Sequence, residues 1–133
     1  ANCPEIEEKY LSLLQRAVPA IALPSFTALN TAFCNDVEPE LVFAQCLMGL
    51  GKKDDILLCI STSGNSKNVV AAALTAKALG LKTIGLTGKT GGKLKSICDI
   101  CICVPETDTS KVQELHLPVY HYLCARVEEE IFL

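Results

Sequence analysis

The sequence contains no long apolar run, no basic leader and no block of like charge. None of its apolar stretches reaches the roughly 20 residues that a membrane-spanning helix needs, and its first residues lack a basic region followed by an apolar core. Its 12 basic and 15 acidic residues leave a net charge of -3 and are dispersed, which argues against a nucleic-acid or membrane-surface partner. We therefore expect a soluble, cytoplasmic protein that binds a small molecule.

The sequence also lacks a second closely spaced cysteine pair. Eight cysteines are present. Cys59, Cys101 and Cys103 lie in apolar strand-like runs, and Cys46 and Cys124 lie in helical patterns, as small buried thiols do. The closest spacing, Cys98-x2-Cys101-x-Cys103, would suit zinc or an iron–sulfur cluster if another pair came from elsewhere. We therefore expect these thiols to pack in the core in a reducing cytosol, with metal binding as the alternative.

Short apolar runs alternate with helical patterns, without repeats, low-complexity tracts or linkers, so the 133 residues predict one domain. The runs predict strands at residues 18–23, 55–60, 82–86 and 100–104. Helices are predicted at residues 3–14, 27–34, 39–50, 67–79 and 91–97, and from residue 108 almost to residue 133, where Pro118 is expected to kink or divide the helix. Strands that are apolar on both faces and alternate with helices predict an α/β fold, a three-layer sandwich with a parallel sheet flanked by helices.

A hydroxyl-rich turn, ISTSGNS at residues 60–66, joins the second predicted strand to the helix at 67–79. The first N–H groups of a helix and its dipole favour an anion, and four hydroxyl groups can donate further hydrogen bonds to it, those of Ser61, Thr62, Ser63 and Ser66. The pattern predicts a phosphate-binding turn. The alternative is that Ser63 or Ser66 only caps the helix.

Two further loops are expected beside this turn, because ligands in parallel sheets collect beyond the carboxyl ends of the strands. They are the Leu86-Thr87-Gly88 turn and the segment after Pro105. The run GLTGKTGG at residues 85–92 is not a nucleotide-binding P-loop, because only two residues separate its first glycine from the Gly-Lys pair. We interpret it as a glycine-rich turn that leaves space for a ligand or for a neighbouring backbone.

The sequence has only two histidines, so any imidazole acid–base or ligand role falls on one of them. Gln113 and His121 are eight positions apart and lie within about 80° on a helical wheel, whereas His116 points about 140° away from His121. Gln113 and His121 can therefore face one crevice. The alternative is that each histidine is structural or solvated.

The chain contains, in this order, the blocks VPAIAL, the Asn35-Asp36 pair, DDILLCISTSGNSKNVV, KTIGLTGKTGGKL, CDICICVP and KVQELHLPVYH. Together these blocks resemble the SIS (sugar isomerase) domain family, in particular its bacterial phosphoheptose isomerase branch. The resemblance covers residues 18–133 nearly continuously and implies that residues 1–133 form a single SIS domain of flavodoxin-like fold.

The resemblance implies the conversion of sedoheptulose 7-phosphate into D-glycero-D-manno-heptose 7-phosphate by a homotetramer. It implies that the turn residues Ser61, Thr62, Ser63 and Ser66 hold the phosphate. It implies that Asn35 and Asp36 contact the sugar. Gln113 and His121 match zinc ligands, and it implies that Gln113 also reaches the substrate and that His121 moves protons.

The chain departs from the family before residue 18, where it lacks an Asn-Gly-Gly-Ser loop and a following helix that supplies a His and a Glu to the zinc site. We expect that a piece is missing there. A chain that truly lacks this piece is expected to have neither a complete metal site nor isomerase activity. The alternatives are a non-catalytic SIS module that binds a sugar phosphate or a protein, and a domain for another sugar, such as a hexosamine phosphate.

Overall fold

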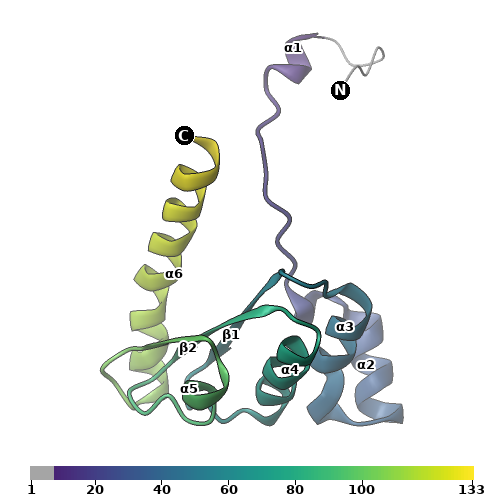
Figure 1. Cartoon of the computed structure of the whole chain (residues 1–133), viewed down its shortest axis with the longest axis vertical. Helices are drawn as coiled ribbons and strands as arrows, with labels where there is room; N and C mark the ends of the chain where they lie inside the picture. Colours follow the sequence, from purple (N-terminus) through teal and green to yellow (C-terminus); the bar gives the residue numbers. More distant parts are fainter. Residues whose placement is uncertain (1–7) are drawn as a thin grey trace.

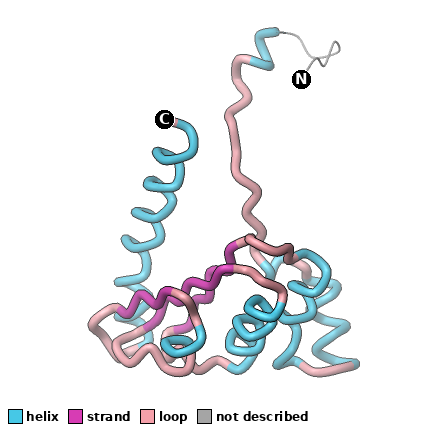
Figure 2. Tube along the Cα trace, in the orientation of Figure 1, coloured by secondary structure: helices cyan, strands magenta, loops and turns pink. Residues whose placement is uncertain are grey.

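The structure is a computed structural model in which residues 8–133 are described (Figure 1). Three parallel strands alternate with helices, and a long helix ends the chain (Figure 2). The elements are α1 (Glu8–Leu11), η1 (Leu23–Ser25), α2 (Thr27–Asp36), η2 (Pro39–Leu41), α3 (Val42–Leu50), β1 (Ile56–Ser61), α4 (Lys67–Ala78), β2 (Lys82–Thr87), α5 (Leu94–Ile97), β3 (Ile100–Cys103) and α6 (Thr109–Phe132). This arrangement confirms the predicted α/β class with flanking helices.

The strands lie in the order β1-β2-β3, and Cys59 pairs with Gly85, which pairs with Cys101. Each connection between neighbouring strands contains a helix, as a parallel pair requires. The carboxyl ends of all three strands therefore lie at the same edge of the sheet.

No helix among residues 8–133 is long and apolar enough to cross a membrane.

One face of the sheet packs against α4. Leu57 and Cys59 point to this face and contact alanines of α4, whose small side chains let the helix approach the strands closely. Three of these alanines are almost fully buried, Ala72, Ala73 and Ala76. Helix α3 packs on α4 as a further layer.

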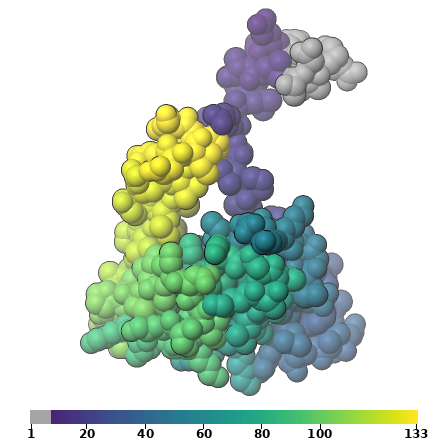
Figure 3. All heavy atoms as spheres, viewed as in Figure 1, coloured from purple at the N-terminus to yellow at the C-terminus, as the bar shows by residue number. Residues whose placement is uncertain are grey.

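The other face of the sheet is only partly covered. Side chains alternate along a strand, so Ile56, Leu58 and Ile60 point away from α4, and they are 66%, 40% and 49% exposed. Helix α6 contacts β2, but its C-terminal half stands clear of the sheet (Figures 1 and 3). The second helical layer is therefore a single helix over part of the sheet.

The strand predicted at residues 18–23 is wrong. Residues 18–22 have no regular structure, and residues 23–25 form η1. This segment runs away from the sheet (Figure 2), and Pro19 and Pro24 lack the N–H groups that a strand ladder uses. Only three of the four predicted strands are therefore present in the described part of the chain.

The helices predicted at 27–34, 39–50, 67–79 and 91–97 are present, although residues 39–41 form η2 and the last of these helices begins only at Leu94. The helices predicted at the two ends of the chain differ in other ways. The first is described only as Glu8–Leu11, and residues 3–7 of that prediction lie outside the described residues. Pro118 does not divide α6, which is one continuous helix. Because Pro118 has no N–H, the carbonyl of Glu114 lacks its usual helical partner, and Glu114 lies on the exposed part of the helix.

Candidate functional site

Three loops meet at the carboxyl edge of the sheet, as predicted. They are residues 62–66 after β1, residues 88–93 after β2 and residues 104–108 after β3. The Gly88 N–H donates to the Thr62 carbonyl at 2.9 Å, and the Lys89 N–H donates to the Glu106 carbonyl at 2.8 Å. The middle loop therefore ties the other two together.

Glycines allow the first two of these loops to touch backbone to backbone. Gly64 has φ +66°, and a Cβ on it would lie 2.0 Å from the Gly91 carbonyl oxygen. A Cβ on Gly92 would lie 2.4 Å from the Ser63 carbonyl oxygen. Of the two uses predicted for the glycine-rich run, the structure has the second, space for a neighbouring backbone.

The serines of the turn do not cap α4 with their side chains. Ser66 is the N-cap residue, but its hydroxyl makes no capping bond and lies 2.9 Å from the Ser61 hydroxyl. The exposed Ser63 hydroxyl accepts a hydrogen bond from the Asn65 N–H at 3.1 Å. Since a hydroxyl that accepts keeps its own proton, Ser63 can still donate to a ligand.

The first turn of α4 leaves two N–H groups available. The first helical bond runs from the Val70 N–H to the Ser66 carbonyl, and the Val69 N–H is taken by the Asn68 side chain. The N–H groups of Lys67 and Asn68 have no hydrogen-bond partner within residues 8–133. Together with the dipole of this 12-residue helix, they favour an anion at the turn.

A hollow of 310 Å³ borders this helix end and is lined by Pro39, Glu40, Lys67 and Asn68. The Lys67 ammonium lies 2.6 Å from the Glu40 carboxylate. This hydrogen bond raises the pKa of Lys67 above its ordinary value. Both groups are exposed, so the pair contributes little to stability, but it joins η2 to the start of α4.

Asn35 and Asp36 are the last two residues of α2, and both are exposed. Helix α2 contacts η2, which in turn contacts α4. Among the described residues, no hydrogen bond or ion pair joins either side chain to the turn. Their predicted contact with a sugar stays a prediction.

Gln113 and His121 are both exposed on α6, about 12 Å apart along the helix axis. His121 lies edge-on to the Tyr120 ring, with centroids 5.1 Å apart. Within residues 8–133, no three His, Cys, Asp or Glu side chains are arranged to hold a metal ion. A structural zinc site needs four ligands and a catalytic one three plus water, so Gln113 and His121 do not fit zinc by themselves.

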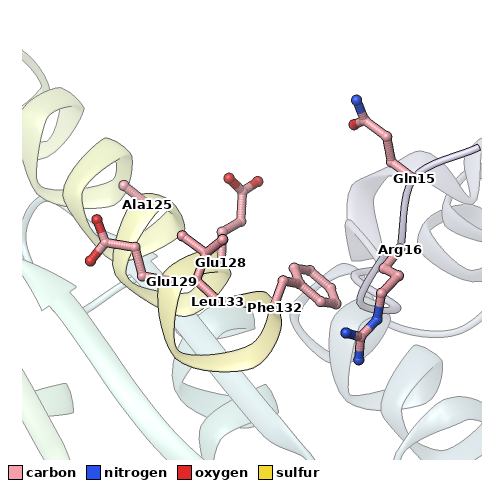
Figure 4. A pocket seen from close by; sticks show the side chains of 7 residues that line it. All are labelled: Gln15, Arg16, Ala125, Glu128, Glu129, Phe132 and Leu133. Carbon is pink, nitrogen blue, oxygen red and sulfur yellow. The ribbon is translucent and has the colours of Figure 1, made fainter. Parts of the chain in front are cut away.

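A second hollow, of 510 Å³, lies at the C-terminal end of α6 (Figure 4). It separates residues 15–16 from the end of α6, and the Arg16 guanidinium lies 5.1 Å from the Phe132 ring. Two carboxylates, those of Glu128 and Glu129, also line it. None of the predicted site residues lies in it.

Two features of the molecule were not predicted. Asn65 bonds to both the turn and the loop after β2, and the only signal for it was its place between a glycine and the helix N-cap. His116 is 3% exposed, and its Nε2 has no hydrogen-bond partner in the described part of the chain. Of the two histidines, the buried one is thus the one predicted to face away from the crevice.

The prediction of buried thiols is confirmed for Cys46 and Cys59, holds only in part for the half-buried Cys101 and Cys103, and is wrong for Cys124. Cys59 is buried, and burial raises its pKa to about 12. The Cys101 and Cys103 sulfurs lie 3.8 Å apart on one face of β3. Cys124, predicted to be buried, is exposed and belongs to the C-terminal half of α6.

The fold and the turn define the class of the protein, an α/β domain with a hydroxyl-rich turn at a helix N-terminus. Residues 10–88 match the family model of the SIS domain. The chain is 49% identical over 115 residues to a phosphoheptose isomerase of Nitratiruptor sp., covering 86% of this chain and 62% of that protein. It is 43% identical over 135 residues to the phosphoheptose isomerase of Clostridium acetobutylicum, covering 99% and 69%.

A phosphoheptose isomerase structure from Francisella tularensis superposes with a TM-score of 0.80 at 39% identity, over 84% of this chain and 60% of that one. The chain therefore belongs to the SIS domain family, in its phosphoheptose isomerase branch. It spans about three fifths of the length of the first of these relatives and of the solved structure.

Proposed function

We propose that this chain is part of a phosphoheptose isomerase that converts sedoheptulose 7-phosphate into D-glycero-D-manno-heptose 7-phosphate. The observation that carries the proposal is the hydroxyl-rich turn against two available N–H groups of α4. Relatives that are 40% to 49% identical bear the name phosphoheptose isomerase. The phosphate would be held by Ser61, Thr62, Ser63 and Ser66.

The reaction moves a proton between neighbouring carbons of the sugar. A base removes a proton beside the carbonyl, the resulting enediolate is stabilised, and an acid returns the proton at the adjacent carbon. In the proposal, His121 moves this proton, Gln113 binds the substrate, and Asn35 and Asp36 contact its hydroxyl groups. Zinc at Gln113 and His121 requires further ligands, and no step above depends on it.

The proposed assembly is a homotetramer in the cytoplasm. Exposed apolar side chains on the uncovered face of the sheet support an assembly, because monomers rarely expose large contiguous apolar patches. Light scattering of the purified full-length protein tests the tetramer. A mass of one chain at micromolar concentration would contradict it.

A non-catalytic SIS module that binds a sugar phosphate, or a protein partner, is the second candidate. It is favoured by the absence of a three-ligand metal arrangement within residues 8–133. Turnover of sedoheptulose 7-phosphate by full-length protein, with and without added zinc, separates the two. Binding without turnover would support the module.

Two substitutions assign roles within the site. His121→Ala is expected to abolish turnover and to leave the affinity for inorganic phosphate unchanged. Ser63→Ala is expected to weaken phosphate binding by about 1 to 3 kcal/mol through a lost hydrogen bond. Ser12→Ala is the matched control for Ser63→Ala, because Ser12 is an exposed serine distant in sequence from the turn. Normal turnover by His121→Ala would show that His121 has no role in the mechanism.

A further inference from the structure

We infer that Asn65 is a positioning residue that holds Ser63 in the orientation needed to donate to the substrate phosphate. This rests on the proposed function of the turn. Asn65 itself does not touch the phosphate in this inference. It acts through Ser63 and through the loop after β2.

Asn65 uses three polar groups, and each has one partner. Its N–H donates to the Ser63 hydroxyl at 3.1 Å, and its side-chain Nδ2 donates to the Ser63 carbonyl at 3.0 Å. Its Oδ1 accepts from the Lys93 N–H at 3.0 Å. Asparagine has the shortest side chain with a donor and an acceptor on separate atoms, so neither aspartate nor alanine can make both bonds.

These bonds make the turn and the glycine-rich loop one unit. The Leu94 N–H donates to the Gly64 carbonyl at 3.1 Å, beside the bond from Lys93 to Asn65. The backbones of Gly64 and Gly91 are in direct contact. A shift of the loop is therefore transmitted to Ser63 through Asn65.

The bond from the Asn65 N–H also restricts the Ser63 hydroxyl. The oxygen of Ser63 accepts from Asn65, so its own proton is free to point at an anion bound in the turn. The side-chain bonds of Asn65, to the Ser63 carbonyl and from the Lys93 N–H, hold the backbone of residue 65 in place. Without them, the backbone N–H that binds the Ser63 hydroxyl is no longer fixed, and the exposed Ser63 side chain can rotate among its staggered rotamers. Binding would then require this rotation to be stopped, which lowers the affinity.

The test is a double-mutant cycle on the full-length protein, measured at a temperature where all variants are folded. Titration calorimetry with inorganic phosphate, and kcat and KM with sedoheptulose 7-phosphate, are the readouts. Asn65→Ala is expected to raise the phosphate Kd by about tenfold and KM similarly, with a smaller change in kcat. In the Ser63→Ala background, the same change is expected to have little further effect.

Asn30→Ala is the matched control, because Asn30 also bonds a backbone carbonyl through its side-chain amide, that of Pro24, outside the turn. Asn65→Asp keeps an acceptor for Lys93 and is expected to bind phosphate as weakly as Asn65→Ala or more weakly. Folded Asn65→Ala with wild-type Kd and KM would overturn the inference, and so would additive effects of the two substitutions. Wild-type protein that neither binds phosphate nor turns over would instead refute the proposed function.

Discussion

Gly64→Ala should be among the most damaging single substitutions in this chain. Gly64 has φ +66°, and an added Cβ would lie 2.0 Å from the Gly91 carbonyl oxygen. Contacts of a Cβ below 3.0 Å are essentially never found, so one of the two loops must move by about 1 Å. That movement breaks the unit formed by the turn and the loop after β2.

The expected loss of stability follows from three contributions. A left-handed conformation costs an alanine roughly 1 to 2 kcal/mol. Two hydrogen bonds across the contact are at risk, from Leu94 to Gly64 and from Lys93 to Asn65, and each contributes about 1 kcal/mol. The free energy of unfolding is therefore expected to fall by roughly 3 to 4 kcal/mol.

Urea unfolding followed by circular dichroism measures this loss, and calorimetry with inorganic phosphate measures its effect on the turn. Gly49→Ala is the matched control, because Gly49 lies in α3 with no atom within 4 Å of an added Cβ. This control is expected to stabilise the protein by roughly 0.5 to 1 kcal/mol. If Gly64→Ala unfolds at the wild-type urea midpoint, the close packing of the two loops does not exist in solution.

Two further predictions concern the start of α6 and the thiols. Hydrogen bonds from the Ser110 hydroxyl and the Lys111 N–H hold the pKa of Asp108 below its ordinary value of 3.8. The ionised Asp108 therefore stabilises the fold above that pH, and this stabilisation is lost as the pH falls through the pKa of the folded state. Asp108→Ala should therefore lower the urea midpoint at neutral pH, and the difference from wild type should shrink below pH 3.8; an equal difference at both pH values would contradict this. In native protein at mildly alkaline pH, iodoacetamide should modify the exposed Cys124 and spare Cys59, whose pKa is about 12. Mass spectrometry of the digested protein measures which cysteine is modified first, and faster modification of Cys59 would contradict the prediction.

Local features of the chain were predictable from the sequence. The apolar run that forms β1 and the helix after it were placed to within a residue or two, because their patterns and the following Gly80 depend only on nearby residues. The hydroxyl-rich turn was predictable for the same reason. The strand predicted at residues 18–23 is absent because a strand needs a partner strand from elsewhere in the chain, and an apolar run does not specify that partner.

Contacts between distant residues were not predictable. Asn65 bonds to Lys93, 28 positions later, and no spacing rule points to that pair. The exposure of Cys124 depends on where α6 leaves the sheet, and the helical pattern around it is the same either way. The predicted roles of Asn35, Asp36, Gln113 and His121 depend on ligands or neighbouring chains, so the fold of one chain leaves them as predictions.

The position of β1 has a practical consequence. It is one of the two edge strands of the sheet in the described residues, so one side of its backbone offers N–H and C=O groups without a strand partner as a template for another strand. The same strand carries the exposed side chains of Ile56, Leu58 and Ile60. A purified preparation of residues 1–133 should therefore precipitate as its concentration is raised. The substitution Leu58→Lys should raise the concentration at which precipitation begins.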